Sequence, residues 1–255
     1  MICKQLLGVQ KQTCNIGVLL ELGRIPIHLY AIKASIKNWQ RIRKGANEQV
    51  RVSYEHAIKD NLPWINNIRG YLEKNGMLCF FNNPFENKPP FIHKKNFQIL
   101  SDCFHQEAFS KITEENSKLR TYGILKEQIG MENYLTQIRN VDIRRTISKF
   151  RLSNHNLNIE KGRHRGIPKE LRFCPFCPNI VETEIHFLIE CRMYHLQREK
   201  TFLAISREKP AFEFYTQKEK FSYLLSDENI KTISKHIHSC FELRNFLLGE
   251  HKRHI

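Results

Sequence analysis

FCPFCPNIVETEIHFLIEC, residues 173–191, contains the most specific pattern of residues in this chain. Within it Cys174, Cys177, His186 and Cys191 follow the spacing C-x2-C-x8-H-x4-C. Three thiols and one imidazole are a complete ligand set for tetrahedral zinc, which prefers thiolate sulfur and imidazole nitrogen. Four protein ligands leave no position for water, as in structural zinc sites. We therefore expect Zn²⁺ to fold a small CCHC zinc knuckle near the C-terminal end.

Two other interpretations of these cysteines are open. A C-x2-C pair also occurs in redox dithiols, but those require a thioredoxin-like βαβ context, which is missing around Cys174. The residues can also be buried, reduced cysteines beside a core histidine. Thr183 and Glu184 are typical of a helix start. Because His186 and Cys191 are five residues apart, about 140° around an ideal helix, a shared metal requires this helix to end or distort before Cys191.

The composition indicates a globular protein with a polyanionic partner. The chain has 255 residues, of which 41% are hydrophobic and 26% charged, which suits one or two domains. Its net charge of +15 indicates a polyanionic partner, such as nucleic acid, and an acidic membrane surface is the other candidate. No apolar run of about 18 residues is present, and Lys4 and Lys11 interrupt the N-terminal apolar stretch, so we expect no membrane partner. The expected location is intracellular, in nucleus or cytoplasm.

Helical periodicity dominates, so the expected fold class is mainly α, and no stretch favours a sheet. A helix is predicted over 27–44, and a second amphipathic stretch over 47–72 is interrupted at Pro63. Residues 76–95 contain three prolines and are expected to form a loop or linker. The predicted division is a helical segment (1–75), this linker (76–95), a helical segment ending in a basic arm (96–170), the zinc knuckle (171–200) and a helical tail (201–255).

The basic arm carries the candidate nucleic-acid contacts. From Arg139 to Arg172 the chain has ten Lys and Arg residues against three acids. Such a cluster beside a metal site favours phosphate binding, although each cation taken singly suits a solvated surface. The predicted phosphate contacts are Arg144, Arg145, Lys149, Arg151, Arg163 and Arg165. Phe173 and Phe176 either stack on bases or belong to the core of the knuckle.

Other motifs carry less chemistry. His236, His238 and Cys240 suggest a second metal site with His251 and His254, but on a helix His238 points away from the other two. Ordinary surface histidines are the favoured interpretation. The glycines fit no phosphate-binding loop, and no Gly-x-Ser-x-Gly elbow is present.

Two stretches carry a family resemblance. RLSNHNLNIEKGRH (151–164), followed by Arg172, CPFC, VETEIHFLIEC, Tyr194 and Arg198, resembles the arm and CCHC knuckle of non-LTR retrotransposon reverse transcriptases. More weakly, LLGVQKQTCNIGVLLELGRIPI (6–27) is similar to the helical segment that follows the polymerase core of that family. The resemblance covers nearly the whole chain and is weakest from Lys200 onward.

This resemblance implies a C-terminal region without its polymerase. Polymerisation in that family needs an aromatic-x-Asp-Asp motif for its metal ions, and this chain contains no Asp-Asp pair. We therefore expect no enzyme activity, but a truncated or domesticated copy that acts as a zinc-dependent module binding RNA, DNA or both. A reverse transcriptase supplied by another chain is the implied protein partner. A helical protein-interaction scaffold stapled by zinc, and a transposon relic without selected activity, are the alternatives.

Overall fold

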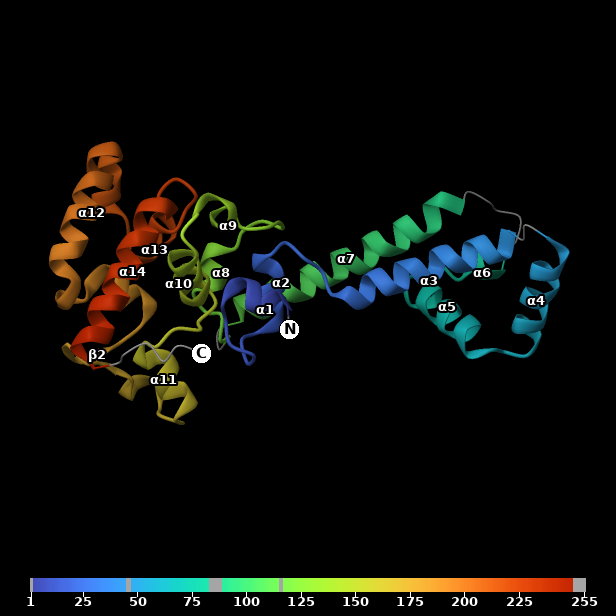
Figure 1. Cartoon of the computed structure of the whole chain (residues 1–255), viewed down its shortest axis with the longest axis horizontal. Helices are drawn as coiled ribbons and strands as arrows, with labels where there is room; N and C mark the ends of the chain where they lie inside the picture. Colours follow the sequence, from blue (N-terminus) through green and yellow to red (C-terminus); the bar gives the residue numbers. More distant parts are fainter. Residues whose placement is uncertain (1, 45–46, 83–88, 115–116, 250–255) are drawn as a thin grey trace. The chain divides into compact units, whose positions relative to one another are not determined.

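The computed structural model describes residues 2–44, 47–82, 89–114 and 117–249 (Figure 1). It is 70% helical and contains one two-stranded sheet, which confirms the predicted mainly α fold class. The chain divides into two compact units: unit 1 contains residues 1–24 and 109–255, and unit 2 contains residues 25–108. The five segments predicted from sequence have other boundaries and stay a prediction. Within the described ranges, no helix has both the length and the apolar character that a membrane crossing requires.

Unit 2 is a set of helices around one tryptophan. It contains α3 (Ile27–Lys44), α4 (Glu48–Lys59), α5 (Pro63–Lys74), α6 (Cys79–Asn82) and the greater part of α7 (Pro89–Thr113). Trp39 is buried, and its Nε1 donates a hydrogen bond to Tyr54 Oη at 3.1 Å. Its ring stacks on that of Phe81, with 5.8 Å between the ring centroids. Tyr30 of α3 packs on Phe97 of α7 at 5.3 Å, so these two helices lie side by side (Figure 1).

The helix starts in unit 2 follow local sequence signals. The predicted helix over 27–44 is confirmed by α3, and the predicted interruption at Pro63 is the boundary between α4 and α5. Pro63 begins α5 because proline at the first helical position has no amide that needs a partner. The loop expected over 76–95 is wrong in part: α6 lies within it and α7 begins at Pro89, for the same reason. Residues 83–88 of that predicted loop lie outside the described residues.

Unit 1 carries the C-terminal half of the chain on shorter helices. Their bounds are α1 (Ile2–Leu7), α2 (Asn15–Glu21), α8 (Tyr122–Leu125), α9 (Tyr134–Gln137), α10 (Val141–Arg151), α11 (Asn158–His164), η1 (Lys169–Leu171), η2 (His186–Glu190), η3 (Arg192–Tyr194), α12 (His195–Glu208), η4 (Pro210–Phe214), α13 (Gln217–Leu224) and α14 (Ile230–Leu247). An aromatic cluster lies in the core of this unit. The ring centroid of Phe187 lies 6.0 Å from that of Phe150, 4.8 Å from that of Tyr194 and 4.6 Å from that of Phe241. These rings tie α10, α14 and the stretch 173–191, hereafter the knuckle, into one core.

A β-hairpin opens the knuckle, which the sequence did not predict. Strand β1 (Phe173–Cys174) pairs antiparallel with β2 (Cys177–Val181), and the register shifts between Phe173 and Cys174. Asn179 in β2 has a φ of +58°, in the left-handed region that asparagine tolerates better than most residues. Strand β1 has two residues, fewer than the roughly four to eight that period-two alternation needs. The five residues of β2 do not alternate between buried and exposed positions, so they carry no such signal either.

Candidate metal centre

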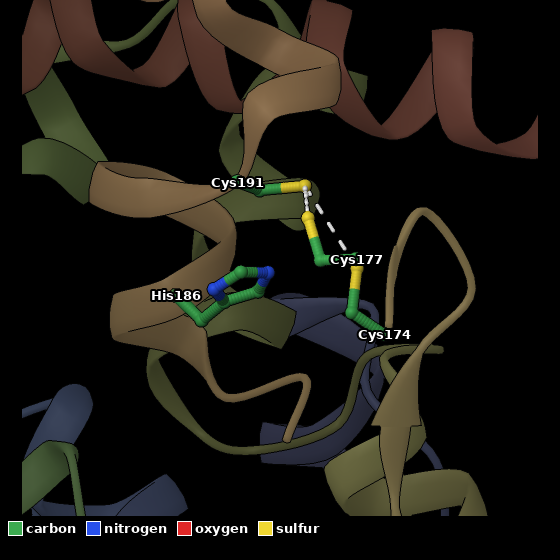
Figure 2. A group of neighbouring side chains, drawn as sticks. All are labelled: Cys174, Cys177, His186 and Cys191. Carbon is green, nitrogen blue, oxygen red and sulfur yellow. Dashed lines mark hydrogen bonds between the residues drawn. The ribbon is translucent and has the colours of Figure 1, made fainter. Parts of the chain in front are cut away.

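The hairpin places the first two thiols of the cluster next to each other. Cys174 and Cys177 are paired residues across the tight turn between β1 and β2, and both side chains are buried. Cys191 comes from the other end of the knuckle, and its Sγ lies 3.8 Å from Cys174 Sγ and 3.7 Å from Cys177 Sγ (Figure 2). One ligand atom from each of these cysteines and from His186 lies within 4.8 Å of every other. The structure therefore brings all four predicted ligands together.

A π-helical turn brings His186 and Cys191 to the same side. The helix begins as predicted at Thr183, whose Oγ1 accepts a hydrogen bond from the His186 amide at 3.0 Å. From His186 to Glu190 the chain is a π-helix, and the Cys191 amide donates to the His186 carbonyl at 2.8 Å. A wider turn aligns residues five apart that an α-helix would separate. The predicted distortion before Cys191 is confirmed.

The orientation of the His186 ring leaves one nitrogen for a metal. Nδ1 lies 3.2 Å from Glu190 Oε2, so this nitrogen carries the proton and donates to the carboxylate. Nε2 is buried and has no hydrogen-bond partner. Nε2 is therefore the nitrogen that can bind a metal, and a carboxylate holding the opposite nitrogen is the usual support of a metal-binding histidine. Glu190 is in turn held by Gln217 of α13.

The spacing of the sulfur atoms fits zinc. In a tetrahedral centre with zinc–sulfur bonds of about 2.3 Å, the sulfur–sulfur edges measure about 3.8 Å. The two sulfur–sulfur distances of 3.7 and 3.8 Å agree with that value. A disulfide requires about 2.05 Å, and all three cysteines are free thiols. The donor set and its geometry fit a closed structural site, with no ligand position left for water.

Cys174, Cys191 and His186 shift one another's pKa values. The hydrogen bond from Cys191 lowers the pKa of Cys174 to about 4, and the same contact raises the pKa of Cys191 above its ordinary range. Burial lowers the pKa of His186, but the adjacent Cys174 sulfur outweighs it and raises that pKa to about 9. A divalent ion needs three thiolates and a neutral imidazole, so binding it displaces protons from these groups.

A buried cation lies beside the cluster. Arg198 in α12 is 8% exposed, and its Nη1 is buried without a hydrogen-bond partner. Burial lowers the pKa of Arg198, while its strongest electrostatic partner, Cys191, acts in the opposite direction. Zinc with three thiolates and one neutral imidazole carries a net charge of about −1. With such an ion bound, the Arg198 guanidinium would offset that charge.

Two glutamates of the knuckle fix it to the rest of unit 1. Glu182 accepts from both Arg244 Nε and Arg244 Nη2, at 3.0 and 2.9 Å, and from the Asn158 amide. Glu184 accepts from His155 Nε2 at 2.8 Å and from Arg120 Nη2 at 2.6 Å. The knuckle is therefore held to α14 by Glu182 and to the turn before α11 by Glu184.

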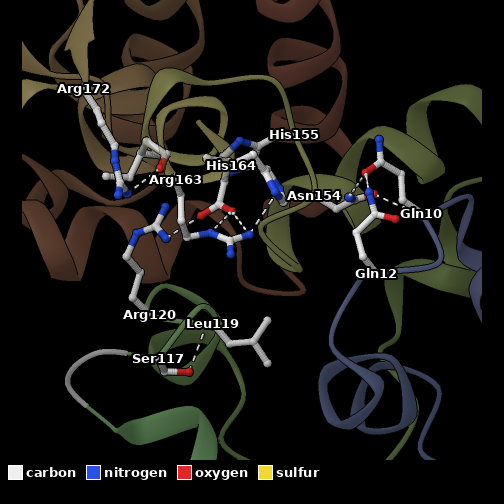
Figure 3. A network of polar contacts seen from close by, with 12 residues as sticks. Gln10, Gln12, Ser117, Leu119, Arg120, Asn154, His155, Arg163, His164 and Arg172 are labelled. Carbon is white, nitrogen blue, oxygen red and sulfur yellow. Dashed lines mark hydrogen bonds and ion pairs between the residues drawn. The ribbon is translucent and has the colours of Figure 1, made fainter. Parts of the chain in front are cut away.

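Figure 3 shows this second group of contacts, in which Arg120, His155 and Arg163 converge. Arg120 bridges Glu184 and Glu160, and Arg163 also pairs with Glu160, at 2.9 Å. Burial alone raises the pKa of Glu184, but His155 and Arg120 together lower it to about 2. Sequence reasoning missed both knuckle glutamates, although charges within the apolar run IVETEIHFLI were a signal of buried ion pairs.

The predicted phosphate contacts lie in different environments. Arg145 and Lys149 of α10 line one cleft of unit 1. Arg144 is half-buried, and its Nη1 donates to the Ile138 carbonyl at 2.9 Å. Arg163 and Arg165 lie at the C-terminal end of α11, where Arg163 is engaged by Glu160 and Arg165 is exposed.

Arg151 has a structural role that differs from the predicted one. Its side chain is 2% exposed and pairs with Glu21 at 2.8 Å and with Glu132 at 2.5 Å. Tyr134 also donates to Glu21, at 2.7 Å. Arg151 follows the buried Ile147 by four residues and so shares its inward face of α10. A guanidinium held this way does not reach a phosphate on the surface.

The weaker second metal site does not form among the described residues. His236 Nε2 lies 3.6 Å from Cys240 Sγ, but His238 turns to Thr146 Oγ1 at 3.0 Å, on another side of α14. His251 and His254 lie outside the described residues. Across the parts of the chain that the structure describes, the Cys174, Cys177, His186 and Cys191 cluster is the one group arranged to hold a metal.

No protein-family model, curated protein or solved structure matches this chain. The resemblance to non-LTR retrotransposon reverse transcriptases therefore stays a prediction from the sequence motifs. What the fold and the site define is a mainly helical protein with a buried Cys/His cluster suited to a structural metal ion.

Proposed function

We propose that this protein is a zinc-folded nucleic-acid-binding module derived from the C-terminal region of a non-LTR retrotransposon reverse transcriptase, without polymerase activity of its own. The observation that supports it most strongly is that one compact unit holds both the cysteine–histidine cluster and the basic helices α10 and α11. Zinc stabilises the knuckle, and the knuckle glutamates hold the turn before α11. Metal binding thereby fixes the surface that carries the cations.

The charge of the chain supports a polyanionic partner. A net charge of +15 favours phosphate binding, because each neutralised phosphate releases counterions. Arg145 and Lys149 lie on α10, and Arg165 follows α11, all within unit 1. RNA and DNA share the phosphate backbone, so both are expected ligands. A polymerase on another chain is the proposed protein partner.

The experiment that tests this function has two steps. Native mass spectrometry of the intact chain is expected to show one zinc ion, and a titration with single-stranded RNA and DNA is expected to show binding. With six phosphates contacted, affinity for these single strands should fall by about 300-fold between about 50 and 200 mM salt. A protein that carries no metal, or that binds neither polymer, overturns the proposal.

A protein-interaction scaffold is the second candidate, favoured by exposed apolar side chains. Leu196 and Leu203 on α12 are 73% and 52% exposed, and Phe246 on α14 is 76% exposed. A partner docked on such side chains would bind with little dependence on salt. The same two salt concentrations therefore distinguish the two functions.

A further inference from the structure

Unit 1 contains a polar cleft of about 550 Å³ that no part of the metal centre uses. Its walls come from α10, the turn over residues 153–156, α11 and α14, and Gln10 closes one side. This volume lies within the range of about 300–1,000 Å³ that is typical of small-molecule sites. It therefore has room for one nucleotide.

Cations from two helices line the cleft. Arg145 and Lys149 project from α10, and Lys161 projects from α11. The stem of Arg145 lies against Gly8, where an added Cβ would be 2.6 Å from Arg145 Cγ. Gly8 has a φ of +66°, so glycine suits this position for conformational as well as steric reasons. The Arg145 side chain is thus supported while its guanidinium stays exposed.

Carboxylates line the cleft beside these cations. Glu160 is buried and already paired with Arg120 at 2.7 Å and Arg163 at 2.9 Å. Asp142 and Glu242 also line the cleft. Carboxylates at a nucleotide site accept hydrogen bonds from the exocyclic amino groups of bases, as they do in base recognition.

Side-chain amides form a second group around the cleft. Asn154 Oδ1 accepts from the backbone amide of Gln10 at 3.0 Å, and Asn154 Nδ2 donates to Gln10 Oε1 at 3.3 Å. Asn156 Nδ2 donates to Asn245 Oδ1 at 2.7 Å. Each pair holds its amides in place, and each amide retains further donor or acceptor capacity. Asparagine and glutamine are the side chains that pair with base edges in both directions.

Packed rings lie at the floor of the cleft. His155 is fixed by Glu184, and its ring lies 5.7 Å from Phe150 and 6.3 Å from Phe241. Two buried polar atoms in the lining residues, His155 Nδ1 and Ser153 Oγ, have no hydrogen-bond partner. A buried polar group without a hydrogen-bond partner costs about 1–3 kcal/mol of stability. A polar ligand at the floor of the cleft would remove this cost by hydrogen-bonding to these atoms.

We infer that this cleft binds one nucleotide of a single-stranded RNA or DNA, with the phosphate at Arg145 and Lys149 and the base among the amides of Asn154 and Asn156. This inference rests on the proposed function and specifies where the strand lies. It also gives a role to the amide and imidazole side chains that line the cleft and do not belong to the metal centre.

The test compares two variants that remove equal charge. Arg145→Gln with Lys149→Gln alters the cleft, whereas Lys218→Gln with Lys231→Gln removes two exposed cations of α13 and α14 that do not line it. The probes are fluorescein-labelled oligocytidylate and oligodeoxycytidylate of about eight nucleotides, a length that single-strand sites commonly cover. Binding to the zinc-loaded full chain is followed by fluorescence anisotropy at several salt concentrations. Far-UV circular dichroism verifies that both variants fold.

The cleft variant is expected to bind both probes at least tenfold more weakly, with the salt slope reduced by about 1.4, the value for two lost phosphate contacts on a single strand. The matched variant should lose less than about threefold. An abasic oligonucleotide of equal charge should also bind more weakly, because it lacks the base. Equal losses of affinity in the two variants would show that the cleft is not the nucleotide site, while leaving the proposed function in place. Failure of the wild-type chain to bind either probe would overturn both.

Discussion

Arg244 and Glu182 form a bidentate ion pair inside unit 1, with Nε and Nη2 of the arginine 3.0 and 2.9 Å from the two carboxylate oxygens. Both side chains are 1% exposed. The pair joins the middle of the knuckle to the last helix of the chain. Two charges this deeply buried are favourable only together, because each alone would lose its hydration without compensation.

Replacing one partner of this pair is therefore expected to destabilise the protein strongly. Arg244→Met should reduce the free energy of unfolding by about 3–5 kcal/mol, because Glu182 would remain buried and unpaired. Urea unfolding followed by circular dichroism measures this change. The double variant Glu182→Met with Arg244→Met should recover part of the loss. The exposed Arg207→Met serves as the control, and a loss of similar size there would contradict the explanation.

Removing one sulfur ligand should release the metal. Cys174→Ser is expected to lose stoichiometric zinc in native mass spectrometry and to lower the Tm, since the binding free energy of a structural zinc is folding free energy. Cys103→Ser, at an exposed cysteine of α7, is the matched control. It should keep the bound zinc and the Tm of the unmodified chain. A Cys174→Ser protein with one tightly bound zinc would show that the cluster is not the site.

Arg198 is predicted to tune metal affinity through its charge. Arg198→Met should weaken zinc binding by about tenfold or more, in the range seen for other residues that support metal ligands. Arg198→Lys should restore part of the affinity, which a purely steric role would not explain. Competition with a chromophoric chelator gives the affinities. Arg192→Met, which changes an exposed arginine next to Cys191, should bind zinc like the unmodified chain.

His236 makes stability depend on pH. Burial, followed by the charge of Arg198, lowers the pKa of His236 to about 4, whereas the unfolded value is about 6.5. Because the unfolded chain binds the proton first, stability should decrease as pH falls from about 6.5 to 4, by at most about 1.4 kcal/mol per pH unit. Urea unfolding gives the free energy of unfolding at pH 7 and at pH 5. The difference between these two values should be smaller for His236→Gln than for the unmodified chain. His195→Gln, at an exposed histidine, should behave as the unmodified chain does, and an unchanged difference in His236→Gln would refute the assignment.

Much of the fold could be predicted because its signals are local. The helix over residues 27–44 follows from apolar spacing, and the start of α5 follows from Pro63. The four ligands were recognisable because residue types and spacing suffice to define a zinc set. Even the distortion before Cys191 followed from helix geometry, since two ligands five residues apart cannot share one face of an α-helix.

The rest depends on contacts between residues far apart in the chain. Glu182 meets Arg244 across 62 positions, and Arg151 meets Glu21 across 130. No local pattern specifies which cations become buried partners of carboxylates and which remain on the surface. Arg151 was therefore grouped with its exposed neighbours, although its spacing from Ile147 and Ser148 placed it on the inner face of α10.

The wide turn between His186 and Cys191 makes this part of the protein sensitive to length. Deleting one residue at 187–190 would place the last thiol four residues after His186, a spacing that an ordinary α-helical turn already aligns. An inserted residue would place it six residues after His186, a spacing that neither an α-helical nor a π-helical turn brings to one side. Insertions here are therefore expected to cost the metal, whereas a single deletion can be absorbed by a return to an α-helical turn.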